Sequence, residues 1–206
     1  MNAQTTFSSR ALSCTTFFFM VTHKAWKKNL LIKYLCPRDF RCGEMEGNMF
    51  KTMRRFKQKL SEEKCIEILT NEPHGVLSLI SDTGYPYGFP ITHWYDEKNG
   101  HIYFHGAKVG HKMDCLKQCD KASFCVMDKG FKKDGEWAVH YQSVIVFGKI
   151  KMVNDPDKVK EICTQLCLKF TNDQNYIDHE LKYSGPSVLC LEFIPEHISG
   201  KIVEES

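Results

Sequence analysis

The sequence lacks the short motifs that mark the most common nucleotide-binding and hydrolytic sites. Its 206 residues contain no strict P-loop, no strict dinucleotide-binding fingerprint and no nucleophilic triad. The net charge of +3 is too small to predict binding to nucleic acid. The composition is nevertheless that of a globular protein, because 42% hydrophobic residues supply enough apolar surface for one domain with a real core.

The ten cysteines show neither a CxxC pair nor the layout of a small disulfide-rich domain. Cys115 and Cys119 are four residues apart on a segment expected to be helical, and so are Cys163 and Cys167. This pattern favours reduced thiols that pack as small hydrophobic side chains in a cytoplasmic protein. A zinc site is the sharper alternative, but the usual ligand spacing is missing.

Residues 1–48 differ from the rest of the chain. Their longest apolar run, 17–21 (FFFMV), is too short to span a bilayer, and no clear signal-peptide pattern surrounds it. We interpret the segment as a loosely ordered extension, or as an upstream reading-frame artefact with Met49 as the functional start. A membrane-surface helix is the alternative. Residues 49–206 are the predicted functional domain, for which no membrane partner is expected.

From Met49 onward, strand signals alternate with tight turns and short helices. Strands are predicted over 75–80, 85–95, 102–105, 122–127, 139–153 and 188–194. Helices are predicted after the N-cap Ser61, near Met113 and from Asp155 to about Phe170, whereas 128–136 and 171–186 are predicted loops. Six strands and three helices predict a mainly β fold, a small antiparallel barrel with flanking helices. The prolines at 86 and 90 indicate an edge, a bulge or a place where a ligand replaces a strand partner.

The stretch 102–116 carries a pattern that suits an anion. A strand is followed by a turn with Gly106 and Gly110, and then by the start of a short helix. Glycines allow close backbone approach, and a helix start offers free N–H groups and a positive dipole end. The cationic or titratable side chains of this stretch are Lys108, His111 and Lys112. An ordinary surface turn with solvated lysines explains the same residues equally well.

Three blocks of sequence follow one another at characteristic spacing: 84–90 (GYPYGFP), 102–112 (IYFHGAKVGHK) and 141–149 (YQSVIVFGK). Together they resemble the flavin-binding split-barrel family, the relatives of pyridoxamine 5′-phosphate oxidase, and within it most closely the nitroimidazole-resistance (Nim) type. The segment 198–201 (ISGK) resembles the end of that branch. The resemblance covers roughly 49–203. It implies a six-stranded antiparallel Greek-key split β-barrel that binds FMN as a homodimer, with each flavin between two subunits.

The resemblance also assigns roles to residues by position. It implies backbone contacts from Pro90, Ile91 and Thr92 to the isoalloxazine edge, and places His111 and Lys112 where the oxidase has an Arg-Lys phosphate pair. A histidine at position 111 cannot form the two parallel hydrogen bonds that an arginine forms with a phosphate. Because the charge of a histidine changes near neutral pH, phosphate affinity is expected to depend on pH. The complete predicted cofactor-binding set is Pro90, Ile91, Thr92, His105, Gly106, Lys108, His111, Lys112, Gln142 and Ser143. His105 matches a cofactor-side histidine of Nim-type proteins and is the predicted catalytic residue, and a strand-end histidine that is hydrogen-bonded to the backbone is the equal alternative. No metal ligand is predicted.

The remaining histidines and tryptophans have weaker assignments. We interpret His74 as structural, His101 as a surface residue of a hairpin and His140 as a residue packed in the core. His93 is expected to face either the flavin or solvent. Trp94 and Trp137 are candidates for the border of the cleft or for the dimer interface.

The resulting functional prediction is a cytoplasmic FMN-dependent oxidoreductase. Its partners would be a reduced nicotinamide or other donor and a small acceptor such as a nitroaromatic compound, with the redox chemistry supplied by the flavin. The alternative is a flavin- or haem-binding module without turnover. A pyridoxamine 5′-phosphate oxidase activity is less favoured, because the segment 196–201 lacks that enzyme's arginine-bearing substrate tail.

Overall fold

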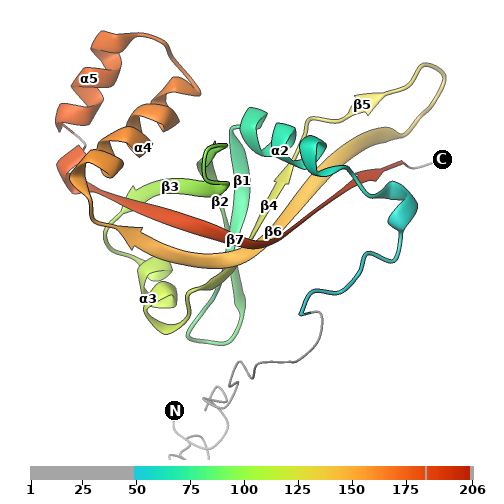
Figure 1. The fold of residues 1–206 in the computed structure, drawn as a ribbon, viewed down its shortest axis with the longest axis horizontal. Helices are drawn as coiled ribbons and strands as arrows, with labels where there is room; N and C mark the ends of the chain where they lie inside the picture. Colours follow the sequence, from blue (N-terminus) through green and yellow to red (C-terminus); the bar gives the residue numbers. More distant parts are fainter. Residues whose placement is uncertain (1–48, 184, 205–206) are drawn as a thin grey trace, which may run out of the picture. The chain divides into compact units, whose positions relative to one another are not determined.

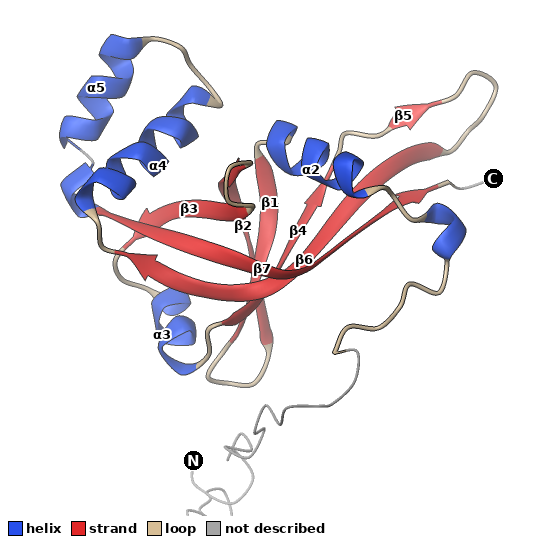
Figure 2. Ribbon diagram, in the orientation of Figure 1, coloured by secondary structure: helices blue, strands red, loops and turns tan. Residues whose placement is uncertain are grey.

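The structure is a computed structural model, and it describes residues 49–183 and 185–204 (Figure 1). The extension predicted over 1–48 lies outside the described residues, and the domain boundary at Met49 therefore stays a prediction. Figure 2 shows that strands dominate the described part and that short helices flank them. The elements in chain order are η1 (Phe56–Gln58), α2 (Glu62–Asn71), β1 (His74–Ile80), β2 (Pro86–Asp96), β3 (His101–Ala107), α3 (His111–Gln118), β4 (Lys121–Met127), β5 (Phe131–Lys132), β6 (Val139–Val153), α4 (Pro156–Leu168), α5 (Gln174–Tyr183), η2 (Gly185–Ser187) and β7 (Val188–Val203).

Six strands close into an antiparallel barrel. The sheet order is β4-β1-β2-β3-β7-β6-β5, and a further pairing between β4 and β6 closes the ring. The prediction of a mainly β, six-stranded antiparallel barrel is therefore confirmed. The two-residue strand β5, which pairs only with β6, lies in the segment predicted as a loop and forms a hairpin that extends beyond the barrel (Figure 1).

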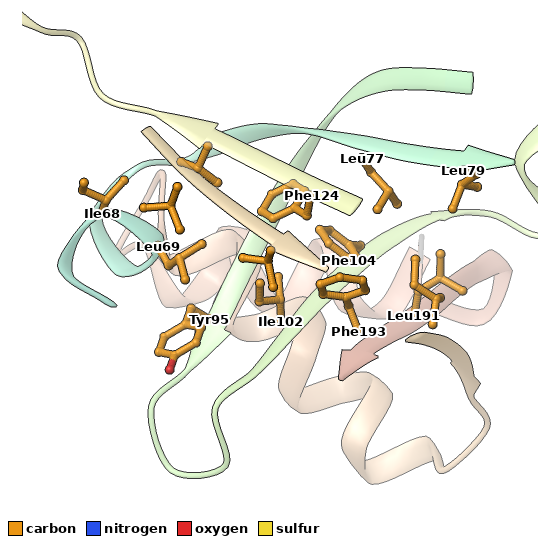
Figure 3. Close-up of a cluster of buried hydrophobic side chains, with 14 of the residues drawn as sticks. Ile68, Leu69, Leu77, Leu79, Tyr95, Ile102, Phe104, Phe124, Leu191 and Phe193 are labelled. Carbon is orange, nitrogen blue, oxygen red and sulfur yellow. The ribbon is translucent and has the colours of Figure 1, made fainter. Parts of the chain in front are cut away.

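Side chains alternate between the two faces of the barrel wall, as the pleat of a strand requires. Phe104, Phe124 and Phe193 are fully buried and meet inside the barrel (Figure 3). On β6, Val144 and Val146 also point inward and are fully buried. The alternation also leaves apolar side chains on the outer face, among them Val76 and Ile145.

Local signals explain where the predicted helices begin. Ser61 accepts a hydrogen bond from the amide of Lys64 and caps α2, and Asp155 caps α4 in the same way through the amide of Asp157. Helix α2 closes the barrel core with Ile68 and Leu69, which are buried. Helix α4 packs on the outside of the wall, where Ile162 forms a second buried cluster with residues of β3 and β7.

Two further predictions of secondary structure were wrong. Helix α5 occupies most of 171–186, which was predicted as an irregular loop because the segment is polar; Ile177 is the only buried residue of this helix. The last strand was predicted to end at 194, but β7 continues to Val203. A register shift at Phe147–Gly148 lets the β6–β7 ladder continue past Pro195, and Gly148 lies so close to the Ile194 carbonyl that a Cβ would not fit.

Candidate functional site

The barrel wall is open between β2 and the end of β3. The ladder between these strands runs only from the pair Asp96–His101 to the pair His93–Phe104. Beyond it, β2 continues alone along β1 as far as Pro86, while β3 continues along β7 as far as Ala107. In the described part of the chain, each strand therefore has one edge without a strand partner at this place.

The open edge of β2 carries backbone groups of two predicted site residues. The amide of His93 bonds the carbonyl of Pro73, 3.3 Å away on the β1 side. Because backbone direction alternates along a strand, the amide and carbonyl of Thr92 and the carbonyl of Pro90 point to the opposite, open edge. Ile91 faces β1, where it pairs with Gly75, and its side chain packs against the core. A proline has no backbone N–H, but none is needed for a ladder at this open edge, so the strand accommodates Pro90.

The end of β3 holds a lysine against a glycine. The ammonium group of Lys112 occupies the space next to Gly106 in which a Cβ would lie, and the Lys112 Cε is 3.2 Å from that position. Burial lowers the pKa of Lys112. No carboxylate forms an ion pair with Lys112 within residues 49–183 and 185–204. A partly desolvated ammonium without a protein counter-ion is suited to an external anion.

Lys112 belongs to the first turn of α3. The helix starts after Gly110, whose φ of 114° lies in a region that favours glycine, and no side chain caps this end. The first amides of an α-helix have no partner inside the helix, and they carry the positive end of its dipole. The predicted strand, glycine turn and helix start are thus present, and Lys112 lies in the first turn of this helix.

His111 packs along the same corner. Its ring meets Tyr87 edge-on at a centroid distance of 4.6 Å, and its Nε2 lies 3.9 Å from Cys115 Sγ. Tyr87 was not among the predicted site residues. The block 84–90 does contain aromatic residues at alternate positions, Tyr87 and Phe89, as expected for one face of a strand. Only the fold shows that Tyr87 reaches α3. Lys108 is exposed in the turn between β3 and α3.

His105 faces outward from β3. It is paired with Cys190 of β7, and it and Thr92 are the next residues beyond the last β2–β3 pair. The ring keeps an exposed surface, but surrounding protein lowers its pKa from 6.5, and the nearby charge of Lys112 lowers this pKa further. The structure therefore brings His105, Gly106, Lys112 and Thr92 to one opening in the wall.

Gln142 and Ser143 are not part of this group within one chain. Ser143 pairs with Lys201 of β7, whereas His105 pairs with Cys190 of the same strand. These two β7 residues are eleven positions apart, roughly 36 Å along the strand path. Asp128 fixes the backbone of Gln142, because its Oδ1 accepts a hydrogen bond of 2.8 Å from the backbone amide of Gln142.

The other histidines have mainly structural partners. The expectation that His93 faces flavin or solvent was wrong, because His93 is fully buried, lies 2.8 Å through Nε2 from the Leu69 carbonyl, and has a pKa lowered to about 3 by burial. His74 Nδ1 lies 3.2 Å from Thr92 Oγ1, which ties it to the open edge. His101 Nδ1 lies 2.7 Å from Glu192 Oε1, and His140 is buried and bonds Glu136.

Among the described residues, no helix is both long and apolar enough to cross a membrane. The same part of the chain contains no group of three or more histidine, cysteine or acidic side chains placed to hold a metal ion.

A closed six-stranded antiparallel barrel with an opening beside β3 is the architecture of the split-barrel proteins. The profile of the pyridoxamine 5′-phosphate oxidase family matches residues 61–202. The chain belongs to this family. A search of curated proteins found no match.

Solved structures share the fold at low sequence identity. A protein from Bacteroides thetaiotaomicron described as a 5-nitroimidazole antibiotic resistance protein has a TM-score of 0.60 and 17% identity, with 70% of this chain and 86% of that chain covered. A conserved hypothetical protein from Mycobacterium tuberculosis has a TM-score of 0.62 and 14% identity, with 73% and 90% covered. An FAD and haem binding protein from Mycobacterium smegmatis has a TM-score of 0.56 and 20% identity, with 72% and 74% covered.

Proposed function

We propose that this protein is an FMN-binding oxidoreductase that passes electrons from a reduced nicotinamide to a small acceptor such as a nitroaromatic compound. The observation that carries the proposal is the position of Lys112, which lies against Gly106 at the start of α3 without a carboxylate partner among the described residues. Membership of the oxidase family and the named flavin binding of one structural relative point to the same cofactor class.

The residues at the opening fit the two ends of FMN. A phosphate dianion requires a cation and several N–H donors, which Lys112 and the first turn of α3 supply. The polar edge of an isoalloxazine requires hydrogen-bond donors and acceptors, which the backbone of Thr92 and the carbonyl of Pro90 offer on the open edge of β2. Bound flavin would supply the redox chemistry, so the protein needs to hold and orient it.

His105 is placed to handle a proton. Its ring faces outward beside Thr92, at the mouth of the opening, while its backbone is fixed in the β3–β7 ladder. Reduction of a nitro group consumes protons as well as electrons, and a positioned imidazole can donate them. An anion bound at Lys112 would offset the charge that lowers the pKa of His105, so cofactor binding would make the ring a better proton carrier near neutral pH.

A second copy of the chain would complete the site. The outer face of the barrel carries a row of side chains at Pro90, Val76, Cys125 and Ile145, which are neighbours on four successive strands. Val76 is 44% exposed and Ile145 is 40% exposed, and adjoining exposed apolar side chains are typical of an interaction surface. Ser143 lies two residues from Ile145, so a homodimer through this face would bring Gln142 and Ser143 toward the partner's flavin.

The purified full chain tests the proposal in two measurements. The absorbance spectrum and the chromatographic identity of the released cofactor distinguish FMN from haem and from no cofactor. Anaerobic mixing of the FMN-loaded protein with reduced nicotinamide, followed by a nitroaromatic acceptor, then separates an oxidoreductase from a binding module. Flavin that stays oxidised with every donor, or that is never reoxidised by acceptor, would favour the module without turnover.

Sedimentation tests the dimer. The wild-type chain should sediment as a dimer at micromolar concentration, and Ile145→Lys should shift it toward monomer because the outer face then carries a charge. Met152→Lys is the matched control, since Met152 is 53% exposed on the same strand but away from this row. A wild-type chain that sediments as a monomer and still binds FMN tightly would contradict the proposed dimer.

A further inference from the structure

Two cysteines from distant parts of the chain meet outside the barrel. Cys163 of α4 and Cys190 of β7 have their Sγ atoms 3.8 Å apart, which is van der Waals contact between sulfurs. Both belong to the buried cluster between α4 and the barrel wall. A disulfide bond is about 2.0 Å long, so the two sulfurs must approach by a further distance of about 1.8 Å before they can bond.

The two thiols differ in access. Cys163 lines a cavity of about 460 Å³ beside α4 and α5, together with Val159 and Leu181. Cys190 is fully buried behind it. A small molecule that enters the cavity therefore meets the sulfur of Cys163 first, and Cys190 is reached only through it.

The surroundings favour the thiolate at Cys163. The hydrogen bond between the two sulfurs, in which either thiol can be the donor, lowers the pKa of Cys163 and raises that of Cys190. Lys160 and Lys182 line the same cavity and offer positive charge, and Asp178 is the acidic group on its wall. The thiolate is the reactive form of cysteine, so nucleophilic character is concentrated at the accessible sulfur.

We propose that Cys163 and Cys190 are a redox-active thiol pair that reacts with hydroperoxides and closes reversibly to a disulfide. The Cys163 thiolate attacks the terminal oxygen of the peroxide, the O–O bond breaks, and the alkoxide or hydroxide leaves and takes up a proton. Cys163 is then a sulfenic acid. The Cys190 sulfur attacks it, the S–S bond forms, and water leaves with the Cys190 proton, so two thiols lose two electrons to one peroxide.

The disulfide would join α4 to β7 beside His105, because Cys190 is the cross-strand partner of His105 and shares the outer face with it. The oxidation state of the pair would therefore alter β7, the strand whose ladder holds the β3 residue His105. The thiol chemistry itself rests on no bound cofactor, and its test is independent of the proposed function.

Peptide mapping after mild oxidation tests the proposal. The folded full chain is treated with hydrogen peroxide, the peroxide is removed, all remaining thiols are blocked with N-ethylmaleimide in denaturant, and the protein is digested with trypsin. The expected product is a linked pair of peptides 161–169 and 183–201, which disappears on treatment with dithiothreitol. A folded wild-type chain that gives no such linkage, while other thiols are oxidised, would overturn the proposal.

Variants assign the two roles. Peptide 161–169 also contains Cys167, so Cys167→Ser is the matched control and should keep the linkage, whereas Cys163→Ser should abolish it. Cys190→Ala should leave a sulfenic acid at Cys163 that dimedone traps, and Cys163→Ser should leave Cys190 unlabelled because that sulfur is buried. Linkage that survives in Cys163→Ser, or dimedone on Cys190 alone, contradicts the assignment. Circular dichroism of each variant shows that the readout comes from folded protein.

Discussion

The ammonium group of Lys112 lies against Gly106, in the space that the side chain of any other residue would require. The two residues are six positions apart, and the turn between β3 and α3 folds one onto the other. The contact removes water from a cation that has no carboxylate partner in the described residues, and it holds that cation at the end of β3, the strand that borders the opening. We regard this pair as the centre of the proposed phosphate site.

Removing the cation should weaken FMN selectively. Lys112→Ala is expected to cost about 1.5–3 kcal/mol of FMN binding, the scale of a hydrogen bond to a charged group. Riboflavin, which has no phosphate, should bind the variant and the wild type alike. Lys117→Ala is the control, because Lys117 is on the same helix but is 71% exposed and pairs with Asp114. Fluorescence titration measures both ligands, and equal losses for FMN and riboflavin would place the phosphate elsewhere.

Filling the space at position 106 should displace the same cation without unfolding the barrel. In Gly106→Ala, the new Cβ collides with the far end of the flexible Lys112 side chain, which can move aside. We expect FMN affinity to fall about as far as in Lys112→Ala, while the melting temperature stays near that of the wild type. Gly185→Ala serves as the control, since a Cβ there meets nothing within 4 Å. FMN affinity unchanged in Gly106→Ala would show that the contact does not position the cation.

The charge of Lys112 should be visible in the titration of His105. In the free protein the pKa of His105 lies below 6.5, first because of burial and then because of Lys112. Binding of FMN or inorganic phosphate should raise it, because the anion offsets the positive charge. In Lys112→Ala the pKa should already be raised and should respond less to phosphate. Proton NMR of the imidazole ring follows both states, and a His105 pKa that is indifferent to phosphate in the wild type would place the anion away from Lys112.

Removing the imidazole of His105 should separate chemistry from binding. His105→Ala is expected to retain FMN but to slow reduction of a nitroaromatic acceptor by about 10²-fold or more, the scale of a lost general acid. Stopped-flow oxidation of the pre-reduced, flavin-loaded variant measures this step alone. If the variant reoxidises at the wild-type rate, His105 has no part in the chemistry and its position at the strand end is structural.

The buried His93 should make the fold sensitive to acid. The pKa of His93 in the folded chain is about 3, below its ordinary value of 6.5. Between these two pH values, His93 is protonated in the unfolded chain but neutral in the folded chain. Stability from this group is therefore present above about pH 6.5 and declines as the pH falls toward 3. Between about pH 7.5 and pH 4.5 the loss should be roughly 2.5 kcal/mol.

His93→Gln isolates that contribution. The glutamine amide can still donate to the Leu69 carbonyl, which His93 Nε2 reaches at 2.8 Å, but it does not titrate. Denaturant unfolding at both pH values should therefore show a smaller difference in the variant than in the wild type. The same acid dependence in both proteins would assign the effect to other groups.

Much of the architecture was predictable because its signals are local. Ser61 and Asp155 cap the helices that they were predicted to start, and β6 spans the predicted residues 139–153. The resemblance of three short blocks also led to the correct barrel type. The prediction failed in α5, a polar segment that buries only Ile177, and in β5, which at two residues is too short to give a strand pattern.

The sequence by itself determined the pieces of the site that lie close together along the chain: Gly106, Gly110 and Lys112, on a strand end, a turn and a helix start. Such short-range geometry follows from backbone preferences and helix caps, which a few neighbouring residues specify. Only the tertiary structure decided that the β2–β3 ladder stops at His93–Phe104, that His93 is buried and that Cys163 touches Cys190. These relationships depend on strand register and on the packing of α4 across the barrel, and register is fixed by the fit of many side chains from distant segments at once.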